Sequence, residues 1–93
     1  MVKGGRQGTD ITEVFLGNNA GQVVISYDML DIPDQIDIYY NGELVQSTYK
    51  PVSQKGSLIW AYPADSDIGY SCTVIVRAPE NGTVWEYSVS CPK

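Results

Sequence analysis

Residues 71–91 read SCTVIVRAPENGTVWEYSVSC, and this stretch decides how we expect the chain to fold. Two runs rich in β-branched and aromatic residues, Ser71–Ala78 and Val84–Cys91, flank the dipeptide Asn81-Gly82. Asn-Gly favours a two-residue type I′ turn, because both central positions of that turn need a positive φ. The stretch therefore predicts an antiparallel hairpin that turns at this dipeptide.

The register of the expected hairpin follows from the position of its turn. It places Arg77 opposite Glu86, an opposite-charge pair of the kind that stabilises neighbouring strands. It also places Cys72 opposite Cys91, and facing residues of a hydrogen-bonded pair lie about 5.5 Å apart at Cα, within disulfide range. We therefore expect a disulfide between Cys72 and Cys91. The alternative is two buried thiols, which are common in the cores of proteins from reducing compartments.

Short runs of this kind, separated by turn residues, extend through most of the chain. We expect seven strands, at Ile11–Leu16, Gln22–Met29, Gln35–Tyr40, Glu43–Thr48, Ser57–Tyr62, Ser71–Ala78 and Val84–Cys91. No segment of ten residues has apolar positions at helical spacing. The pattern is typical of an antiparallel β-sandwich or jelly roll, so we expect an all-β fold. The glycine-rich residues 1–10 are expected to form an arm, and residues 11–93 a single domain.

A second Asn-Gly dipeptide, at residues 41–42, predicts a hairpin between Gln35–Tyr40 and Glu43–Thr48. In that register Ile38 faces Val45 on the inner side, and Tyr39 faces Leu44 on the outer side. An apolar pair on the face that should contact water indicates an interface, although single exposed apolar residues are common on any surface.

The composition argues against several classes of function. The net charge is −5 with only six basic residues, so we expect neither nucleic acid nor an anionic membrane as partner. The chain has no histidine, the commonest general base and metal ligand, so we expect a non-enzymatic protein. No apolar run reaches the roughly 18 residues of a membrane helix, and because no hydrophobic stretch follows the basic residues near position 1, we expect no signal peptide there.

Four aspartates at three-residue spacing form the densest group of charges: Asp28, Asp31, Asp34 and Asp37. Carboxylates around a proline-containing turn could supply several of the six to eight oxygens that Ca²⁺ takes. Aspartate is also common in turns for conformational reasons alone. We expect no cofactor, with calcium as the alternative.

The candidate contacts to a partner are side chains expected at loop edges, on outer faces or in the arm. Tyrosines at such positions are suited to partner contact, because one end of the ring is apolar and the other polar. Trp60 and Trp85 are expected in the core instead. The expected partner-binding residues are Lys3, Arg6, Tyr39, Leu44, Tyr49 and Tyr70.

Two stretches carry a resemblance to known proteins. They are Ser26–Met29 followed by Ile32–Gly42, and Ala78-Pro79 followed by Gly82–Pro92. They look like small β-sandwich modules of secreted bacterial proteins and bacteriophage particles, over about residues 22–92. In particular, the chain is similar to phage decoration or cement proteins, which bind the outer surface of the capsid and stiffen it. The resemblance implies no catalytic residues and assigns no binding residues.

These observations predict a non-enzymatic structural protein at the virion surface, with a capsid shell or an equivalent protein assembly as partner. Such a protein would act in many copies, as a homo-oligomer, so that weak contacts add up. The alternative is an extracellular module that binds carbohydrate, with or without Ca²⁺. A third hypothesis is a spacer domain of an adhesin.

Overall fold

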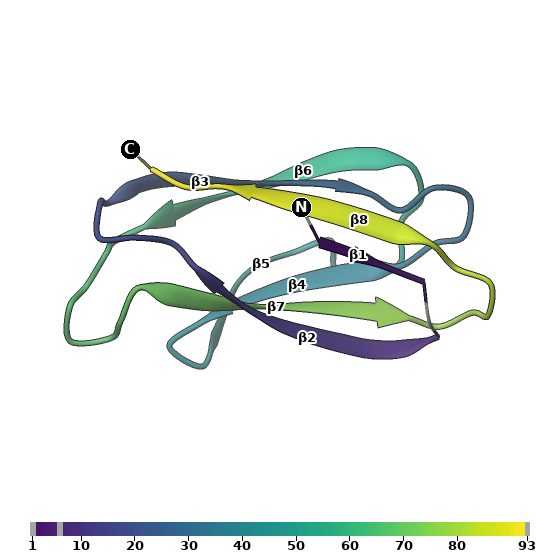
Figure 1. The fold of residues 1–93 in the computed structure, drawn as a ribbon, viewed down its shortest axis with the longest axis horizontal. Helices are drawn as coiled ribbons and strands as arrows, with labels where there is room; N and C mark the ends of the chain where they lie inside the picture. Colours follow the sequence, from purple (N-terminus) through teal and green to yellow (C-terminus); the bar gives the residue numbers. More distant parts are fainter. Residues whose placement is uncertain (1, 6, 93) are drawn as a thin grey trace.

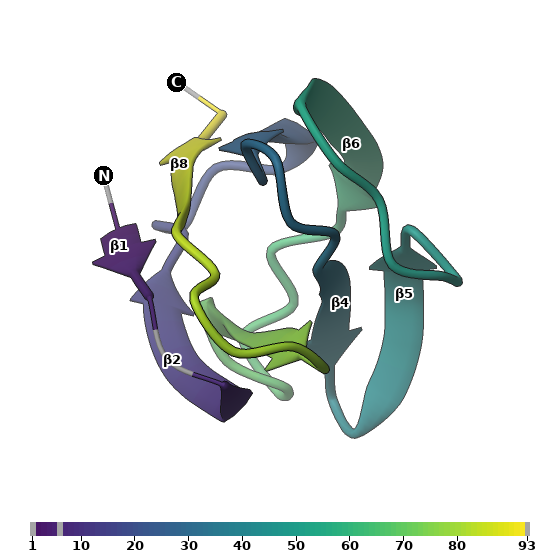
Figure 2. The same cartoon turned by 90° about the vertical axis from the view of Figure 1, so that its right-hand side faces the viewer.

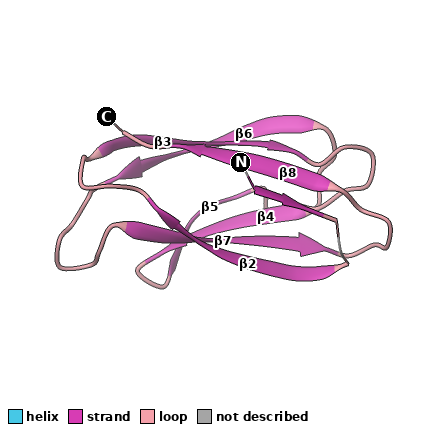
Figure 3. Cartoon of the chain, viewed as in Figure 1, coloured by secondary structure: helices cyan, strands magenta, loops and turns pink. Residues whose placement is uncertain are grey.

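The computed structural model describes residues 2–5 and 7–92, and every regular element in them is a strand (Figure 3). The expected all-β class is confirmed, with eight strands instead of seven. No helix in the described part of the chain is long and apolar enough to cross a membrane. The strands are β1 (Val2–Gly4), β2 (Gly8–Phe15), β3 (Gly21–Asp28), β4 (Gln35–Tyr40), β5 (Glu43–Ser47), β6 (Lys55–Tyr62), β7 (Ser71–Ala78) and β8 (Trp85–Ser90).

The strands form two four-stranded sheets packed face to face (Figure 1). Sheet A has the order β1-β8-β3-β6, sheet B has the order β2-β7-β4-β5, and neighbouring strands are antiparallel in both. Seen end-on, β1 and β2 lie on one side of the sandwich and β5 and β6 on the other (Figure 2). A hydrogen bond of 3.0 Å from the Gln46 side chain to the Ile59 carbonyl connects β5 with β6.

The prediction that residues 71–91 form a hairpin is wrong. Strand β7 lies between β2 and β4 in sheet B, whereas β8 lies between β1 and β3 in sheet A. Gly82 has a φ of 77°, but Asn81 has no positive φ, so the dipeptide does not form the type I′ turn. Instead, residues 79–84 carry the chain from one sheet to the other.

The alternation of apolar residues shows which face of a strand is buried but not which sheet the strand joins. Val74 and Val76 of β7 and Trp85 and Tyr87 of β8 all point into the core, as expected. Placing the two strands in opposite sheets lets these apolar faces pack across the core. In consequence Arg77 faces Gln35 instead of Glu86, and Cys72 faces Val14 instead of Cys91.

The hairpin at Asn41-Gly42 is confirmed near its turn. The two residues have φ values of 55° and 74°, as a type I′ turn requires, and Tyr39 faces Leu44. A bulge after Ile38 then shifts the register by one residue, so that Ile38 faces Gln46 and not Val45. The bulge aligns Ser47 with Asp37, whose carboxylate accepts a hydrogen bond from the Ser47 hydroxyl.

Large rings fill much of the space between the sheets. Tyr40, Trp60 and Tyr62 form a cluster with ring centroids 5.2–5.6 Å apart, and the rings of Trp85 and Tyr87 lie 5.9 Å apart near the other end. Trp85 is buried, and Trp60 is partly buried against the core. The core prediction is therefore confirmed for Trp85, while Trp60 faces the core and packs against its margin.

Part of the expected N-terminal arm belongs to the sheets. Val2–Gly4 forms the edge strand β1, which pairs with β8, and β2 already begins at Gly8. Gly4 lies under the indole of Trp85, where any larger residue would overlap the ring. Gly56 is covered in the same way by Tyr27. A ring that covers a glycine on a neighbouring strand replaces the packing that the glycine lacks.

Candidate functional site

The outer face of sheet B carries the most exposed apolar side chains on any strand. In β2, Ile11 is 66% and Phe15 is 71% exposed, while Val14 on the opposite face packs against the core. The sequence pattern did not predict these two side chains as contact residues, because β2 has apolar residues on both faces and its pattern does not say which face is covered. The only feature of the sequence that pointed to an exposed apolar face was the presence of apolar residues on both faces of this strand.

Strand β2 is also a long open edge of the sandwich; β6, the other eight-residue end strand, is connected with β5 by the Gln46 hydrogen bond. Strand β2 is an end strand of sheet B and has eight residues, whereas β1, the end strand of sheet A beside it, has three. The register of β2 with β7 runs from Gly8 to Phe15 without a bulge, and β2 contains neither lysine nor proline. Proteins protect edge strands with short length, bulges, proline or charged residues, and of these β2 has only Asp10 and Glu13, so its backbone remains open to pairing with another chain.

Three of the predicted partner-binding residues lie near the same end of sheet B. Tyr39 and Leu44 face each other beside the Asn41-Gly42 turn, and Tyr70 immediately precedes β7. Tyr39 and Tyr70 are half-buried and Leu44 is exposed. Both tyrosines line a hollow of about 560 Å³ on this surface.

The other predicted partner-binding residues lie elsewhere. Lys3 is on β1 in sheet A, where its Nζ lies 3.9 Å from a carboxylate oxygen of Glu86. Tyr49 follows β5, at the end of that strand away from the Asn41-Gly42 turn, and is 73% exposed. Arg6 lies outside the described residues. The five candidates that the structure describes therefore do not form one surface.

The hollow beside Tyr39 and Tyr70 contains polar groups that sequence analysis did not single out. Glu13 of β2 and Thr73 of β7 face each other, and the Thr73 hydroxyl donates a hydrogen bond of 3.0 Å to the Glu13 carboxylate. Asn41 of the turn and Ile68 of the loop before β7 also line it. These residues are distant in sequence, so only the sheet pairing could bring them together.

The four aspartates considered as calcium ligands are not brought together. Asp28 accepts a hydrogen bond from the backbone amide of Leu30, and Asp31 accepts one from the side chain of Gln54. Asp34 and Asp37 are buried and bound to other side chains. Within residues 2–5 and 7–92, no three Asp, Glu, Cys or His side chains are placed to hold one metal ion.

The two buried aspartates have opposite shifts in pKa. Burial raises the pKa of Asp34 above its ordinary value, and the hydrogen bond from Thr83 only partly offsets this effect. Burial also acts on Asp37, but hydrogen bonds from Ser47, Gln35 and Arg77 outweigh it and lower the pKa of that carboxyl. Both carboxylates are therefore held by hydrogen bonds from neighbouring side chains inside the sandwich.

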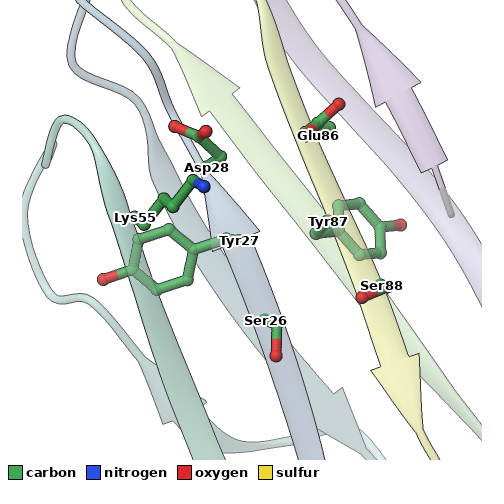
Figure 4. Close-up of a pocket in the computed structure, with 7 residues that line it drawn as sticks. All are labelled: Ser26, Tyr27, Asp28, Lys55, Glu86, Tyr87 and Ser88. Atoms are coloured by element: carbon green, nitrogen blue, oxygen red, sulfur yellow. The ribbon is translucent and has the colours of Figure 1, made fainter.

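A second hollow, of about 170 Å³, lies on the outer face of sheet A (Figure 4). Asp28 and Glu86 face each other across its floor, Lys55 faces Asp28, and Lys3 faces Glu86 from the edge strand. Each carboxylate therefore has a lysine on its outer side. The hollow is smaller than the roughly 300 Å³ at which small-molecule sites begin, and we assign it no ligand.

Both cysteines are free thiols in the structure. Cys72 is buried in sheet B, and Cys91 is half-buried just after β8, with its sulfur 3.8 Å from the Phe15 carbonyl oxygen. Burial raises the pKa of Cys72 to about 11, and Cys91 and Glu13 add to the shift. At neutral pH Cys72 is therefore protonated and a poor nucleophile.

No protein-family model, curated protein or solved structure matches this chain. Function therefore has to be inferred from the surfaces of the molecule itself. The resemblance to phage decoration proteins stays a prediction. The two surfaces with distinctive chemistry are the open β2 edge and the hollow beside Tyr39 and Tyr70.

Proposed function

We propose that this protein is a non-enzymatic structural protein that docks on the surface of a large protein assembly, such as a virus capsid. The contact would be made by the open edge of β2 and by its outward-facing side chains Ile11 and Phe15. The observation that carries the proposal is the exposure of Ile11 and Phe15, 66% and 71%, on the open edge strand.

An open edge offers two kinds of contact at once. Its outward N–H and C=O groups can pair with an extended segment of another chain, and alternate side chains give that pairing specificity. Ile11 and Phe15 lie on the same face of β2, four residues apart, so both can contact one partner surface. Burying them removes from water the most exposed apolar side chains of the strands.

The charge of the protein favours a basic partner surface. Asp10 and Glu13 lie on β2, and the chain as a whole carries a net charge of −5. A second copy of the same strand would bring like charges together, whereas a basic surface complements them. On a particle with many equivalent sites, several weak contacts of this kind give firm attachment.

Photo-crosslinking tests this proposal. The photoreactive amino acid p-benzoylphenylalanine would replace Phe15 in the protein expressed by its natural source, and sedimented particles would be irradiated. We expect a crosslink to the subunit that forms the particle shell. The matched control replaces Ile59, which is exposed on the outer face of sheet A. Absence of the protein from the particles, or equal crosslinking from Ile59, would contradict the proposal.

A further inference from the structure

We propose that the hollow beside Tyr39 and Tyr70 binds a neutral oligosaccharide. The hollow lies over the end of sheet B, between β2, the β4–β5 turn and the loop before β7. Its chief lining residues are Glu13, Tyr39, Asn41, Ile68, Tyr70 and Thr73. This activity goes beyond the docking proposed above, although both use β2, because Glu13 of the hollow lies between Ile11 and Phe15 on the same face of that strand.

The size and the walls of the hollow suit a small ligand. Its volume of about 560 Å³ lies within the roughly 300–1,000 Å³ typical of small-molecule sites. The Tyr40 hydroxyl donates a hydrogen bond of 2.9 Å to the Gly69 carbonyl, and the Leu16 amide donates one of 2.6 Å to the Tyr70 carbonyl. These bonds tie the loop before β7 to the sandwich. The walls are therefore formed before a ligand arrives, which lowers the entropic cost of binding.

The side chains combine apolar surface with neutral polar groups. Tyr39 and Tyr70 are half-buried, so their rings are held in place while part of each remains accessible. Sugars present apolar C–H faces, which pack on such rings, and hydroxyl groups, which both donate and accept hydrogen bonds. Asn41 can donate and accept, the Thr73 hydroxyl can accept while it donates to Glu13, and the Glu13 carboxylate accepts. The hydrogen bond from Thr73 orients that carboxylate at the rim.

The charge of the hollow selects among possible ligands. The described residues that line it include one carboxylate, Glu13, and no lysine or arginine. A phosphate, sulfate or carboxylate group would meet repulsion from Glu13 without any compensating cation. A neutral sugar avoids this cost and gains a charge-assisted hydrogen bond to the carboxylate.

Titration followed by ¹H–¹⁵N NMR tests the proposal. The probes are maltotriose, cellotriose, xylotriose and mannotriose, with a sulfated disaccharide as the anionic comparison. We expect at least one neutral trisaccharide to shift the amide signals around Asn41, Tyr70 and Thr73, and the sulfated sugar to leave them unchanged. Glu13→Ala and Tyr70→Ala should each weaken binding about tenfold, because each removes a main contact.

Two controls separate binding from folding. Tyr49→Asn removes a tyrosine away from the hollow and keeps a residue that tolerates the φ of 61° found there, so it should bind as the parent does. Glu13 is exposed on an outer face, so Glu13→Ala should retain the parent melting temperature even if Tyr70→Ala does not. The proposal is overturned if no neutral sugar shifts these signals, if the sulfated sugar shifts them equally, or if Tyr49→Asn weakens binding as much as Glu13→Ala.

Discussion

Arg77 reaches diagonally across sheet B to Asp37, and its Nε donates a hydrogen bond of 2.8 Å to the Asp37 carboxylate. The two residues do not face each other in the register, since Arg77 faces Gln35. The Asp37 side chain is only 5% exposed, while that of Arg77 is 45% exposed. The guanidinium therefore covers a buried carboxylate whose other side-chain partners, Ser47 and Gln35, are neutral.

Replacing Arg77 should destabilise the protein. Arg77→Met keeps most of the apolar length of the side chain but removes the charge beside Asp37. Because the arginine is partly exposed, we expect a loss of about 1–2 kcal/mol in the free energy of unfolding, below the value for a fully buried pair. Urea denaturation at pH 7 measures it. Lys3→Met breaks the exposed pair with Glu86 and should change stability by about 0.5 kcal/mol or less. Equal losses would show that the buried carboxylate is not the cause.

Asp34 should make stability depend on pH in the opposite sense from most carboxylates. Burial raises its pKa above 3.8 in the folded protein, so the folded state holds this proton at a pH where the unfolded chain has released it. The stability from that proton is complete below about pH 3.8 and is lost as the pH rises through the folded pKa. Asp34→Asn has no carboxyl group to ionise at this position, so it does not lose stability in this way as the pH rises. The variant should therefore gain stability relative to the parent between pH 4 and pH 7, as measured by denaturation at several pH values. A difference that is constant over this range would contradict the assignment.

The two cysteines should differ in reactivity. Cys72 is buried with a pKa of about 11, whereas Cys91 is half-buried. Iodoacetamide at pH 8 should therefore alkylate Cys91 first, and Cys72 should react only when the protein unfolds. Peptide mass spectrometry over time measures both rates. Equal rates in the folded protein would contradict the burial of Cys72.

Intact mass without reductant tests the predicted disulfide, which would block both thiols.

Gly4 should not tolerate a side chain. Even the Cβ of alanine would overlap the indole of Trp85. Gly4→Ala should push this ring out of place, destabilise the protein by about 1–3 kcal/mol and move tryptophan emission to longer wavelength. Ser57→Ala, an equally small change on the outer face of sheet A, should alter neither quantity. Unchanged emission in Gly4→Ala would show that the ring does not depend on the glycine.

The parts of the fold that depend on neighbouring residues were predictable from the sequence. The bounds of β4 and β7 were predicted to the residue, and the Asn41-Gly42 turn fixed the pairing of Tyr39 with Leu44. Strand β1 was missed, because its glycine-containing sequence has no strand pattern of its own and it forms only where the edge of β8 accepts it.

The parts that depend on distant residues could not be predicted in this way. Two strands joined by Asn81-Gly82 can pair in one sheet or face each other across a core, and both arrangements bury the same alternating side chains. The pairing of Glu13 with Thr73, which shapes the hollow, depends on β2 lying next to β7. Tyr39 and Tyr70 were predicted as contact residues one at a time, without their common site.

The positions of the last two strands have a consequence for how the protein is made. Strand β7 separates β2 from β4, and β8 separates β1 from β3. Neither sheet can be completed from residues 2–70, because sheet B still lacks β7 and sheet A still lacks β8. The sandwich can therefore form only after β8 has been synthesised, and the apolar strands made earlier lack their partners until then.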